Sequence, residues 1–375
     1  GESMELKDLR DKIDEVDDVI TGAYIKRLAL VKQVGEYKKQ NNVPVEHGDR
    51  EQAILDRLTA KFGAEYKTAI DYLYTGIMTY SKMRQNMCKA KGKETRFEKS
   101  DVDFSNETSV GLAGTTGAYA EQAAKKLFPK MKPTFYAHFG DVFSAVDKGE
   151  IKYGIVPIEN STAGSVNEVY DLLKEYNIKI VAADRLTVNH CLFGTADSDV
   201  EDIRKVYSHP QALYQCKRFL ESRGIQGVEE SNTAVACRKV AEMNDKSVGA
   251  IGAESNADKG LKLLKKGLQD AEHNFTRFIV IAKTLTVSAD ADKLSLMVSI
   301  KHRPGTLFSL LSILSSFKVN LLKLESRPIP EQEFEFMFYL DIQCDVFAES
   351  TGEMLACIDA YCETMSVLGA YHEEM

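Results

Sequence analysis

Pro157-Ile-Glu-Asn-Ser-Thr-Ala-Gly-Ser-Val166 lies where a strand pattern gives way to a helical one. Before it, Tyr153 to Ile158 is an apolar run with the length of a buried strand, and after it the apolar residues recur with helical spacing to Glu175. Ser161, Thr162 and Ser165 are typical helix-capping residues, and a helix start offers N–H groups to an anion. The alternative is a capped loop without a ligand, which is the commoner case.

Length and composition indicate a soluble protein of several domains. The 375 residues allow two or three domains at about 150 residues each. The net charge of −8 argues against nucleic acid as the main partner. The sequence shows no secretory signal and no apolar run near ~18 residues, so we expect a cytoplasmic chain without a membrane partner. The 7 cysteines are scattered, so we expect reduced thiols, no metal and no cofactor.

Residues 4–89 are predicted to be all-helical. One apolar pattern runs from Leu6 to about Gln40, residues 41–44 interrupt it, and further helices are expected near 49–60 and 65–88. The two shorter helices are not long enough to cover the whole apolar face of the first helix. A dimer is therefore expected.

Two cations of the first helix share a face. Arg27 and Lys38 are eleven residues apart, which at about 100° per residue returns them to within about 20° of each other. Arg10 points about 100° away from Arg27, so it cannot join that site from the same straight helix, but it could join the site of a partner subunit. Taken singly, each such charge more often belongs to a solvated helix face.

The helical region as a whole resembles the all-helical chorismate mutases. The resemblance implies that chorismate is bound by polar side chains from three helices, with Lys38 and Gln85 in catalytic roles; the full set is Arg10, Arg27, Lys38, Arg50, Glu51, Ser81 and Gln85. His47 departs from the family, since many relatives have Asp there. The rearrangement to prephenate needs no nucleophile, only a clamp and donors directed at the ether oxygen.

Residues 90–109 are polar and are predicted to form a linker. From Val110 to about Ala282 short apolar runs alternate with helical segments, which indicates an α/β fold. The segment from Gly111 to Gly117 has the spacing of neither a dinucleotide fingerprint nor a P-loop, so we interpret it as a second carboxylate-binding helix start. Further helix starts are expected at Ser208-His-Pro210 and at residues 231–236.

These blocks, followed by Asn274-Phe-Thr-Arg-Phe278, resemble the prephenate dehydratases. The resemblance implies two lobes with the substrate between them and a hydrogen bond from Thr276 to the departing hydroxyl. It also implies that five residues bind prephenate, namely Asn160, Ser161, Ser208, Gln215 and Arg277. Aromatisation drives the reaction, so a modest donor suffices. Glu159 is either a protonated acid or one half of an ion pair.

Residues 292–375 show the order β-α-β-β-α-β, which is ferredoxin-like. Arg303-Pro-Gly-Thr-Leu-Phe308 and Glu325-Ser-Arg-Pro328 resemble the ACT regulatory domains of phenylalanine-regulated dehydratases, although Thr306 stands where Ala is usual. The resemblance implies an allosteric phenylalanine site at Gly305, Thr306, Leu307, Glu325, Ser326 and Arg327. The alternative is a domain that only dimerises.

The complete pattern resembles a multidomain, bifunctional enzyme. Its expected domains are a helical mutase domain at 4–89, a linker at 90–109, an α/β two-lobed dehydratase domain at 110–284 and an α+β ACT domain at 292–375. The resemblance implies conversion of chorismate to prephenate and then to phenylpyruvate, under feedback inhibition by phenylalanine, in a homodimer or tetramer. A non-catalytic amino-acid sensor is one alternative, but it does not need the cations of the first ninety residues. A dehydratase acting on arogenate is the other.

Overall fold

The computed structural model describes residues 6–41, 43, 48–90, 95–256, 260–271, 274–328 and 336–374. The chain forms two compact units, each assembled from segments that are distant in the sequence. The first unit combines residues 1–97 with 296–366, and the second combines 98–295 with 367–375.

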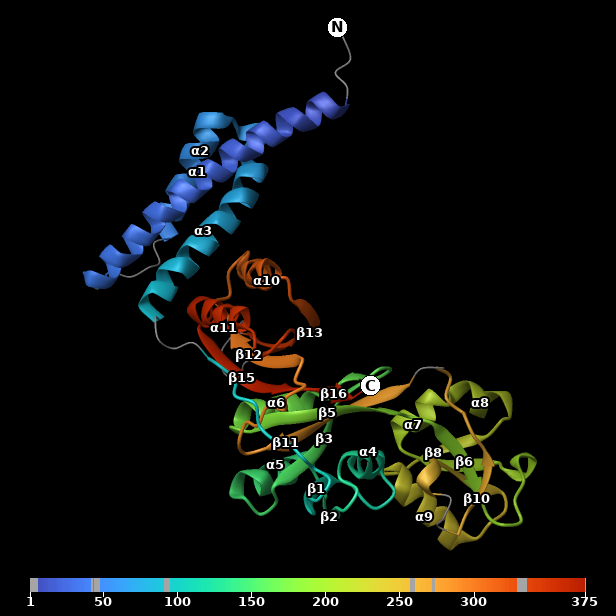
Figure 1. Cartoon of the computed structure of the whole chain (residues 1–375). Helices are drawn as coiled ribbons and strands as arrows, with labels where there is room; N and C mark the ends of the chain where they lie inside the picture. The colour runs from blue at the N-terminus through green and yellow to red at the C-terminus, as the bar shows by residue number, and fades with distance from the viewer. Residues whose placement is uncertain are drawn as a thin grey trace. The chain divides into compact units, whose positions relative to one another are not determined.

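Three helices, drawn in blue in Figure 1, form the N-terminal part of the first unit. They are α1 (Leu6–Gln40), α2 (Gly48–Phe62) and α3 (Lys67–Ala90), with a 3-10 turn at Ala64–Tyr66. The all-helical prediction for this region is confirmed. Gly35 of α1 permits close approach to α3, because a Cβ at this position would lie 3.3 Å from Cα of Gln85. The polar pocket described below forms where these helices meet.

The C-terminal part of the sequence, most of which belongs to the first unit, follows the order β-α-β-β-α-β. Its elements are β12 (Lys293–Ser299), α10 (Thr306–Ser316), β13 (Asn320–Pro328), β14 (Phe336–Gln343), α11 (Glu349–Tyr361) and β15 (Thr364–Tyr371). The strands are arranged as β13-β14-β12-β15, and β13 pairs antiparallel with β14. Helices α10 and α11 pack against α3, so segments that are distant in the sequence meet within this unit.

The first lobe of the second unit is a sheet in the order β5-β11-β3-β1-β2. Its strands are β1 (Ser109–Ala113), β2 (Lys132–Tyr136), β3 (Tyr153–Asn160), β5 (Lys179–Thr187) and β11 (Phe275–Ala282). Its helices are α4 (Tyr119–Leu127), α5 (Phe139–Lys148) and α6 (Asn167–Glu175). Strand β11 runs antiparallel to both β3 and β5, which places the start of β11 beside the end of β3.

The second lobe is a five-stranded sheet in the order β10-β6-β9-β7-β8. Its strands are β6 (His190–Gly194), β7 (Lys205–Ser208), β8 (Gln226–Glu229), β9 (Val248–Ala253) and β10 (Lys262–Lys265). Its helices are α7 (Pro210–Gln215), α8 (Lys217–Ser222) and α9 (Thr233–Met243), with 3-10 turns at Val200–Asp202 and Glu254–Asn256. The chain enters this lobe after β5 and leaves it before β11. The α/β prediction for this part of the sequence is confirmed.

One local prediction is wrong: Ser161, Thr162 and Ser165 do not cap a helix. Helix α6 begins after Val166 without a side-chain cap, and Ser165 lies in the short strand β4 (Gly164–Ser165), which pairs with β3. The reason is Asn160, whose Oδ1 accepts the N–H groups of Thr162 (3.0 Å) and of Ala163 (2.9 Å) and so closes a tight turn.

At the predicted carboxylate-binding helix start after Gly117, a carboxylate of the protein itself binds a backbone N–H group. The N–H of Gly117 donates to Oε2 of Glu121 at 2.6 Å, so a protein carboxylate already occupies this group. By contrast, α7 begins with Pro210 as predicted, and Asn232 caps α9 by accepting the N–H of Val235 at 2.8 Å. Within the described ranges, no helix is long and apolar enough to cross a bilayer.

Candidate active sites

A polar pocket of about 360 Å³ lies between α1, α2 and α3. It is lined by predicted chorismate-binding residues from all three helices: Arg27, Lys38, Arg50, Glu51, Ser81 and Gln85. The helical periodicity therefore brought Arg27 and Lys38 to the same pocket, as their spacing predicts. We call this cavity the mutase pocket.

Two buried side chains form the floor of the mutase pocket. Ser81 accepts a hydrogen bond from Nη1 of Arg27 at 2.5 Å and donates its own hydrogen to the carbonyl of Ile77 at 2.6 Å. Gln85 is only 8% exposed, and its Oε1 has no hydrogen-bond partner among the residues the structure describes. A buried amide without a partner costs stability, so its placement in a pocket points to a ligand.

Lys82 is a member of this pocket that sequence reasoning missed. Its Nζ lies 3.0 Å from Oε1 and 3.1 Å from Oε2 of Glu51. Lys82 follows Met78 by four residues and precedes Gln85 by three, so helical spacing on α3 is the signal that points to it. The predicted anchor Glu51 is therefore held by a cation from the neighbouring helix.

Two predicted features of the mutase site lie elsewhere. Arg10 is exposed on α1 and does not line the mutase pocket. Its proposed reach into a partner subunit stays a prediction. His47, the predicted departure from the family, lies outside the residues that the structure describes.

The second polar site is built around Thr276 at the start of β11. Thr276 stands opposite Asn160 in the antiparallel register between β11 and β3. Nδ2 of Asn160 donates to Oγ1 of Thr276 at 3.0 Å and to Oδ1 of Asn274 at 3.1 Å. Since the Thr276 oxygen is the acceptor in this bond, its own hydrogen remains available to a bound substrate.

Gln215, at the end of α7, links the two lobes. Its Nε2 donates to Oγ1 of Thr162, while its Oε1 accepts from Nδ2 of Asn274 at 3.1 Å. Thr162, Gln215 and Asn274 line a cavity of about 420 Å³ that also presents Lys217 and Arg218. The predicted residues Asn160, Gln215 and Thr276 thus belong to one network beside a cavity that carries both cationic and acidic side chains.

A buried histidine, His190, contacts Gln215 of this network. Nε2 of His190 lies 2.7 Å from Oε1 of Gln215, and Nδ1 lies 3.0 Å from the hydroxyl of Tyr119. Because the amide oxygen only accepts, Nε2 carries the hydrogen and Nδ1 accepts from Tyr119. Burial lowers the pKa of His190 despite the opposing hydrogen bond with Gln215, and burial raises the pKa of Tyr119. The imidazole is therefore neutral near pH 7 and holds the Gln215 amide in one orientation.

Three other predicted substrate ligands have partners within the protein. Ser208 is fully buried and donates to the carbonyl of Ile251 at 2.7 Å. Ser161 accepts the N–H of Phe275 at 3.0 Å, which ties the loop to β11. Arg277 is 3% exposed and points to a buried acid. Substrate-binding roles for these three stay predictions, and each requires a contact beyond those present.

Glu373 is the acid that engages Arg277, and it gathers three cations. Nε of Arg277 lies 2.9 Å from Oε2 of Glu373, Nε of Arg185 lies 2.5 Å from Oε1, and Lys293 also pairs with Oε2. Successive side chains of a strand point to opposite faces, so Arg277 turns away from the face that carries Thr276. Burial by itself raises the pKa of Glu373. The three cations Arg277, Lys293 and Arg185 together lower this pKa by a larger amount, so the net shift is downward.

Glu373→Gln is expected to lower the free energy of unfolding at pH 7 by about 3 kcal/mol, because it leaves buried cations without their counter-charge. The carboxylate contributes its stability above its ordinary pKa of 4.5, and this contribution is lost as the pH falls through the lower value of the folded state. Urea unfolding at pH 7 and at pH 3.5 measures both effects, with the exposed Glu363→Gln as the control. An equal urea midpoint for Glu373→Gln and Glu363→Gln at pH 7 contradicts this role.

Comparison with known proteins relates the two sites to established families. The family model "Chorismate mutase type II" matches residues 9–86, and the family model "Prephenate dehydratase" matches residues 110–285. The bifunctional chorismate mutase/prephenate dehydratase of Escherichia coli K12 is 32% identical over 98% of this chain and 96% of its own length. The chain belongs to the bifunctional chorismate mutase/prephenate dehydratase family.

Two further comparisons cover about seven tenths of the chain. The chloroplastic arogenate dehydratase/prephenate dehydratase 2 of Arabidopsis thaliana is 32% identical over 72% of this chain and 74% of its own length. The prephenate dehydratase of Arthrobacter aurescens, solved in complex with L-Phe, has a TM-score of 0.65 and 24% identity, and the match covers 70% of this chain and 89% of that structure. The latter supports the fold. In this member of the bifunctional family the mutase match spans the helices of the mutase pocket, and the dehydratase match spans both lobes around Thr276.

Proposed function

We propose that the chain catalyses two successive reactions at two separate sites, chorismate to prephenate in the mutase pocket and prephenate to phenylpyruvate beside Thr276. The observation that carries the proposal is the convergence of Arg27, Lys38, Arg50 and Gln85 on one pocket, because a sensor of amino acids has no need of it. The purified chain should form phenylpyruvate when it is given prephenate alone. If no phenylpyruvate forms from prephenate, the proposed dehydratase activity is refuted.

The mutase step is an intramolecular rearrangement, so the pocket acts by positioning and electrostatics. Arg27 and Arg50 are suited to hold the two carboxylates of chorismate, because a guanidinium binds a carboxylate with two parallel hydrogen bonds. Lys38 and Gln85 are suited to donate to the ether oxygen as it becomes negative. Of the two polar atoms of the Gln85 amide, only the nitrogen can donate to the ether oxygen, because the oxygen is an acceptor.

The dehydratase step expels the ring hydroxyl together with carbon dioxide and leaves an aromatic ring. Thr276 donates a hydrogen bond to the departing hydroxyl, and Asn160 fixes the Thr276 oxygen from the other side at 3.0 Å. Gln215 and the neutral His190 hold the amide network that borders the cavity. Lys217 and Arg218 line the same cavity together with Glu221 and Asp270, and their side chains are suited to hold the substrate carboxylates.

We also propose that the mutase helices dimerise. Helix α1 leaves a row of large apolar side chains in solvent, including Ile13 (58% exposed), Val16 (56%) and Ile20 (52%). An apolar face of this kind is normally covered by another protein surface. A second copy of the chain, with its Arg10 directed at the neighbouring pocket, is the occupant that the family resemblance implies.

The C-terminal β-α-β-β-α-β segment is proposed to be an ACT domain that binds phenylalanine. Gly305 has φ of 86°, a left-handed conformation suited to glycine, and Thr306 donates to carbonyl oxygens in the same turn at 2.9 Å. The second predicted block, Glu325 to Arg327, lies on β13 at the end of the sheet order, where a strand has one edge available for a second domain. Leu307 precedes the exposed Phe308 at the start of α10.

Phenylalanine is expected to inhibit the dehydratase with a sigmoidal dose response, because binding between two ACT domains links ligand binding to assembly. Calorimetry on the whole chain should show heat of binding. Thr306→Ala should bind phenylalanine more tightly, since Thr adds a hydroxyl and a branch at this turn. The sensing role is refuted if the chain shows no heat and its dehydratase is unaffected by millimolar phenylalanine.

A further inference from the structure

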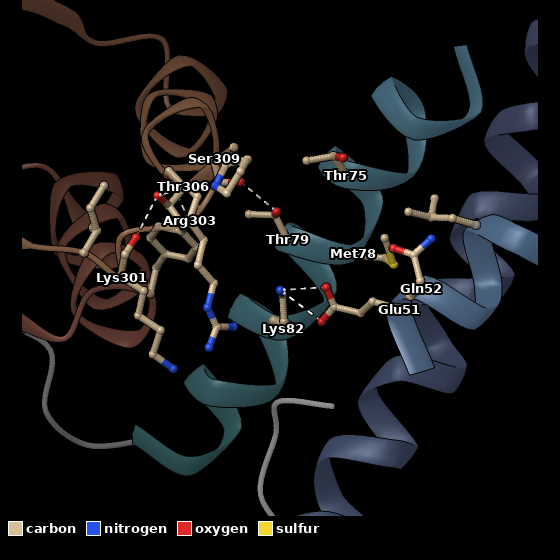
Figure 2. Close-up of a pocket in the computed structure, with 15 residues that line it drawn as sticks. Glu51, Gln52, Thr75, Met78, Thr79, Lys82, Lys301, Arg303, Thr306 and Ser309 are labelled. Atoms are coloured by element: carbon tan, nitrogen blue, oxygen red, sulfur yellow. Dashed lines mark hydrogen bonds and ion pairs between the residues drawn. The ribbon is translucent and has the colours of Figure 1, made fainter. Parts of the chain in front are cut away.

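Lys82 of α3 forms an ion pair with Glu51 of α2 in the wall of the mutase pocket. Nζ of Lys82 lies 3.0 Å from Oε1 and 3.1 Å from Oε2 of Glu51. Figure 2, which looks into a neighbouring cavity of the same unit, shows both contacts as dashed lines. Among the residues that the structure describes, Lys82 is the only cation paired with Glu51. One ammonium group from a neighbouring helix therefore holds both oxygens of this carboxylate.

Helix geometry directs Lys82 to the mutase pocket. Gln85 follows Ser81 by four residues and Lys82 by three, so the three side chains lie together on one face of α3, and all of them line the pocket. Ser81 accepts a hydrogen bond from Arg27 of α1 at 2.5 Å, and Lys82 donates to Glu51 of α2. Two successive residues of α3 thus each support a predicted chorismate ligand that belongs to another helix.

The chemistry of chorismate restricts what Glu51 can bind. Within the described part of the chain, Glu51 is the only carboxylate that lines the mutase pocket, where it stands among Arg27, Lys38, Arg50 and Lys82. A carboxylate only accepts hydrogen bonds. The carboxylates and the ether oxygen of chorismate are also acceptors, and its ring hydroxyl is its one hydrogen-bond donor. Glu51 can therefore attract the substrate only through this hydroxyl.

Lys82 affects Glu51 in two ways that favour this contact. The charge of Glu51 by itself repels a substrate with two carboxylates, and a cation at 3.0 Å offsets the repulsion. The contact with both oxygens also restricts a flexible side chain before the substrate arrives, which lowers the entropic cost of binding. Each carboxylate oxygen has two lone pairs, so Lys82 leaves one on each oxygen for the hydroxyl.

The ion pair contributes little to the stability of the fold. The side chains of Lys82 and Glu51 are 29% and 31% exposed, and ion pairs in contact with solvent stabilise proteins only slightly. A neutral side chain at position 82 is therefore compatible with folding. The effect of the pair is expected on the substrate, because both side chains line the pocket that receives it.

We propose that Lys82 is a positioning residue of the mutase, which holds the Glu51 carboxylate for the ring hydroxyl of chorismate and so makes the enzyme selective for the hydroxylated substrate. The inference rests on the proposed mutase function, since the rearrangement is its readout. Lys82 acts through Glu51 and has no contact with the reacting atoms. Its role differs in this respect from that of Lys38, which is assigned to the ether oxygen.

The test compares chorismate with its deoxy analogue, which keeps both carboxylates and lacks the ring hydroxyl. A direct attraction between Lys82 and the substrate carboxylates affects both compounds equally, so it cancels in the ratio of their kcat/KM values. The wild-type chain should prefer chorismate by about 10-fold or more, as for a hydrogen bond to a charged acceptor. In Lys82→Met, which removes the charge and keeps a long side chain, the preference should fall to about 2-fold.

The effect on chorismate itself should appear in the KM. Lys82→Met should raise the KM by about 5-fold or more with kcat within about 2-fold, because the hydroxyl contact is the same in the ground state and the transition state. Lys82→Arg keeps the charge and should restore most of the preference for chorismate. Glu51→Gln should lose the preference as Lys82→Met does. Lys61→Met, the same change on an exposed lysine of α2 outside the pocket, should match the wild type.

The proposal is overturned if the wild-type chain does not prefer chorismate to the deoxy analogue, or if Lys82→Met keeps the full preference. A rise in KM that is equal for both compounds means that Lys82 binds a substrate carboxylate directly, which also overturns it. Lys82→Gln is a second neutral variant and should behave as Lys82→Met. A wild-type chain that does not rearrange chorismate refutes the proposed function, whereas an active chain whose preference is independent of Lys82 refutes this inference alone.

Discussion

Thr276→Val is expected to reduce the dehydratase turnover by roughly 10²- to 10⁴-fold, the range for loss of a positioned proton donor. Valine has the shape of threonine and lacks only the hydroxyl, so the packing of β11 between β3 and β5 is preserved. The mutase turnover should not change, because the mutase pocket is formed by α1, α2 and α3 of the other unit. Measuring phenylpyruvate formation from prephenate, and separately the loss of chorismate, gives both values.

Thr134→Val is the matched control for this substitution. Thr134 is exposed on β2 of the same lobe, so both activities should equal those of the wild type. Loss of both activities in Thr276→Val means that the chain has one shared site. Full dehydratase activity in Thr276→Val means that the hydroxyl has no catalytic role.

Lys38→Ala is expected to lower the mutase turnover by roughly 10²-fold or more, since the ammonium stabilises charge that develops only in the transition state. The dehydratase activity on added prephenate should be retained. Initial rates of chorismate loss at saturating substrate measure the effect. Lys39→Ala is the control, because Lys39 is exposed on the next position of α1 and does not line the mutase pocket. Equal turnover in Lys38→Ala and Lys39→Ala contradicts the assignment.

The sequence predicted the elements well wherever one periodicity ran without interruption. The apolar spacing from Leu6 to Gln40 corresponds to a single helix because no proline or glycine pair interrupts it, and Asn41 marks its end. The order of strands and helices in residues 292–375 was equally predictable from the sequence, because short turns separate these elements. The loop after Asn160 was misread, since its hydroxyls resemble helix caps while a side-chain amide closes the turn.

The candidate sites divide between residues that local spacing can find and residues that only tertiary structure brings together. Arg27 and Lys38 are related by helix geometry, so their meeting in one pocket was predictable. His190, Gln215 and Tyr119 come from different elements, and no periodicity relates them. Asn274 is the first residue of the block that contains Thr276, and its place in that block was the available signal for including it.

The direction of Arg277 shows why a motif does not fix the role of each residue in it. The residue follows Thr276 on the same strand and therefore faces the other side of the sheet, where Glu373 meets it at the C-terminus. The sequence separates Arg277 and Glu373 by 96 residues, so this partner was not evident from the motif. The position of the arginine supports a structural role for it in the second unit.

The central claim, two separable active sites in one chain, is tested most directly by mixing the Lys38→Ala and Thr276→Val proteins and supplying chorismate. We predict that each variant alone forms little phenylpyruvate, whereas the mixture forms it with prephenate as a detectable intermediate. The Thr276→Val protein makes the prephenate, and the Lys38→Ala protein dehydrates it. A mixture that forms no more phenylpyruvate than the separate variants, under conditions where the wild-type chain converts chorismate fully, contradicts the account.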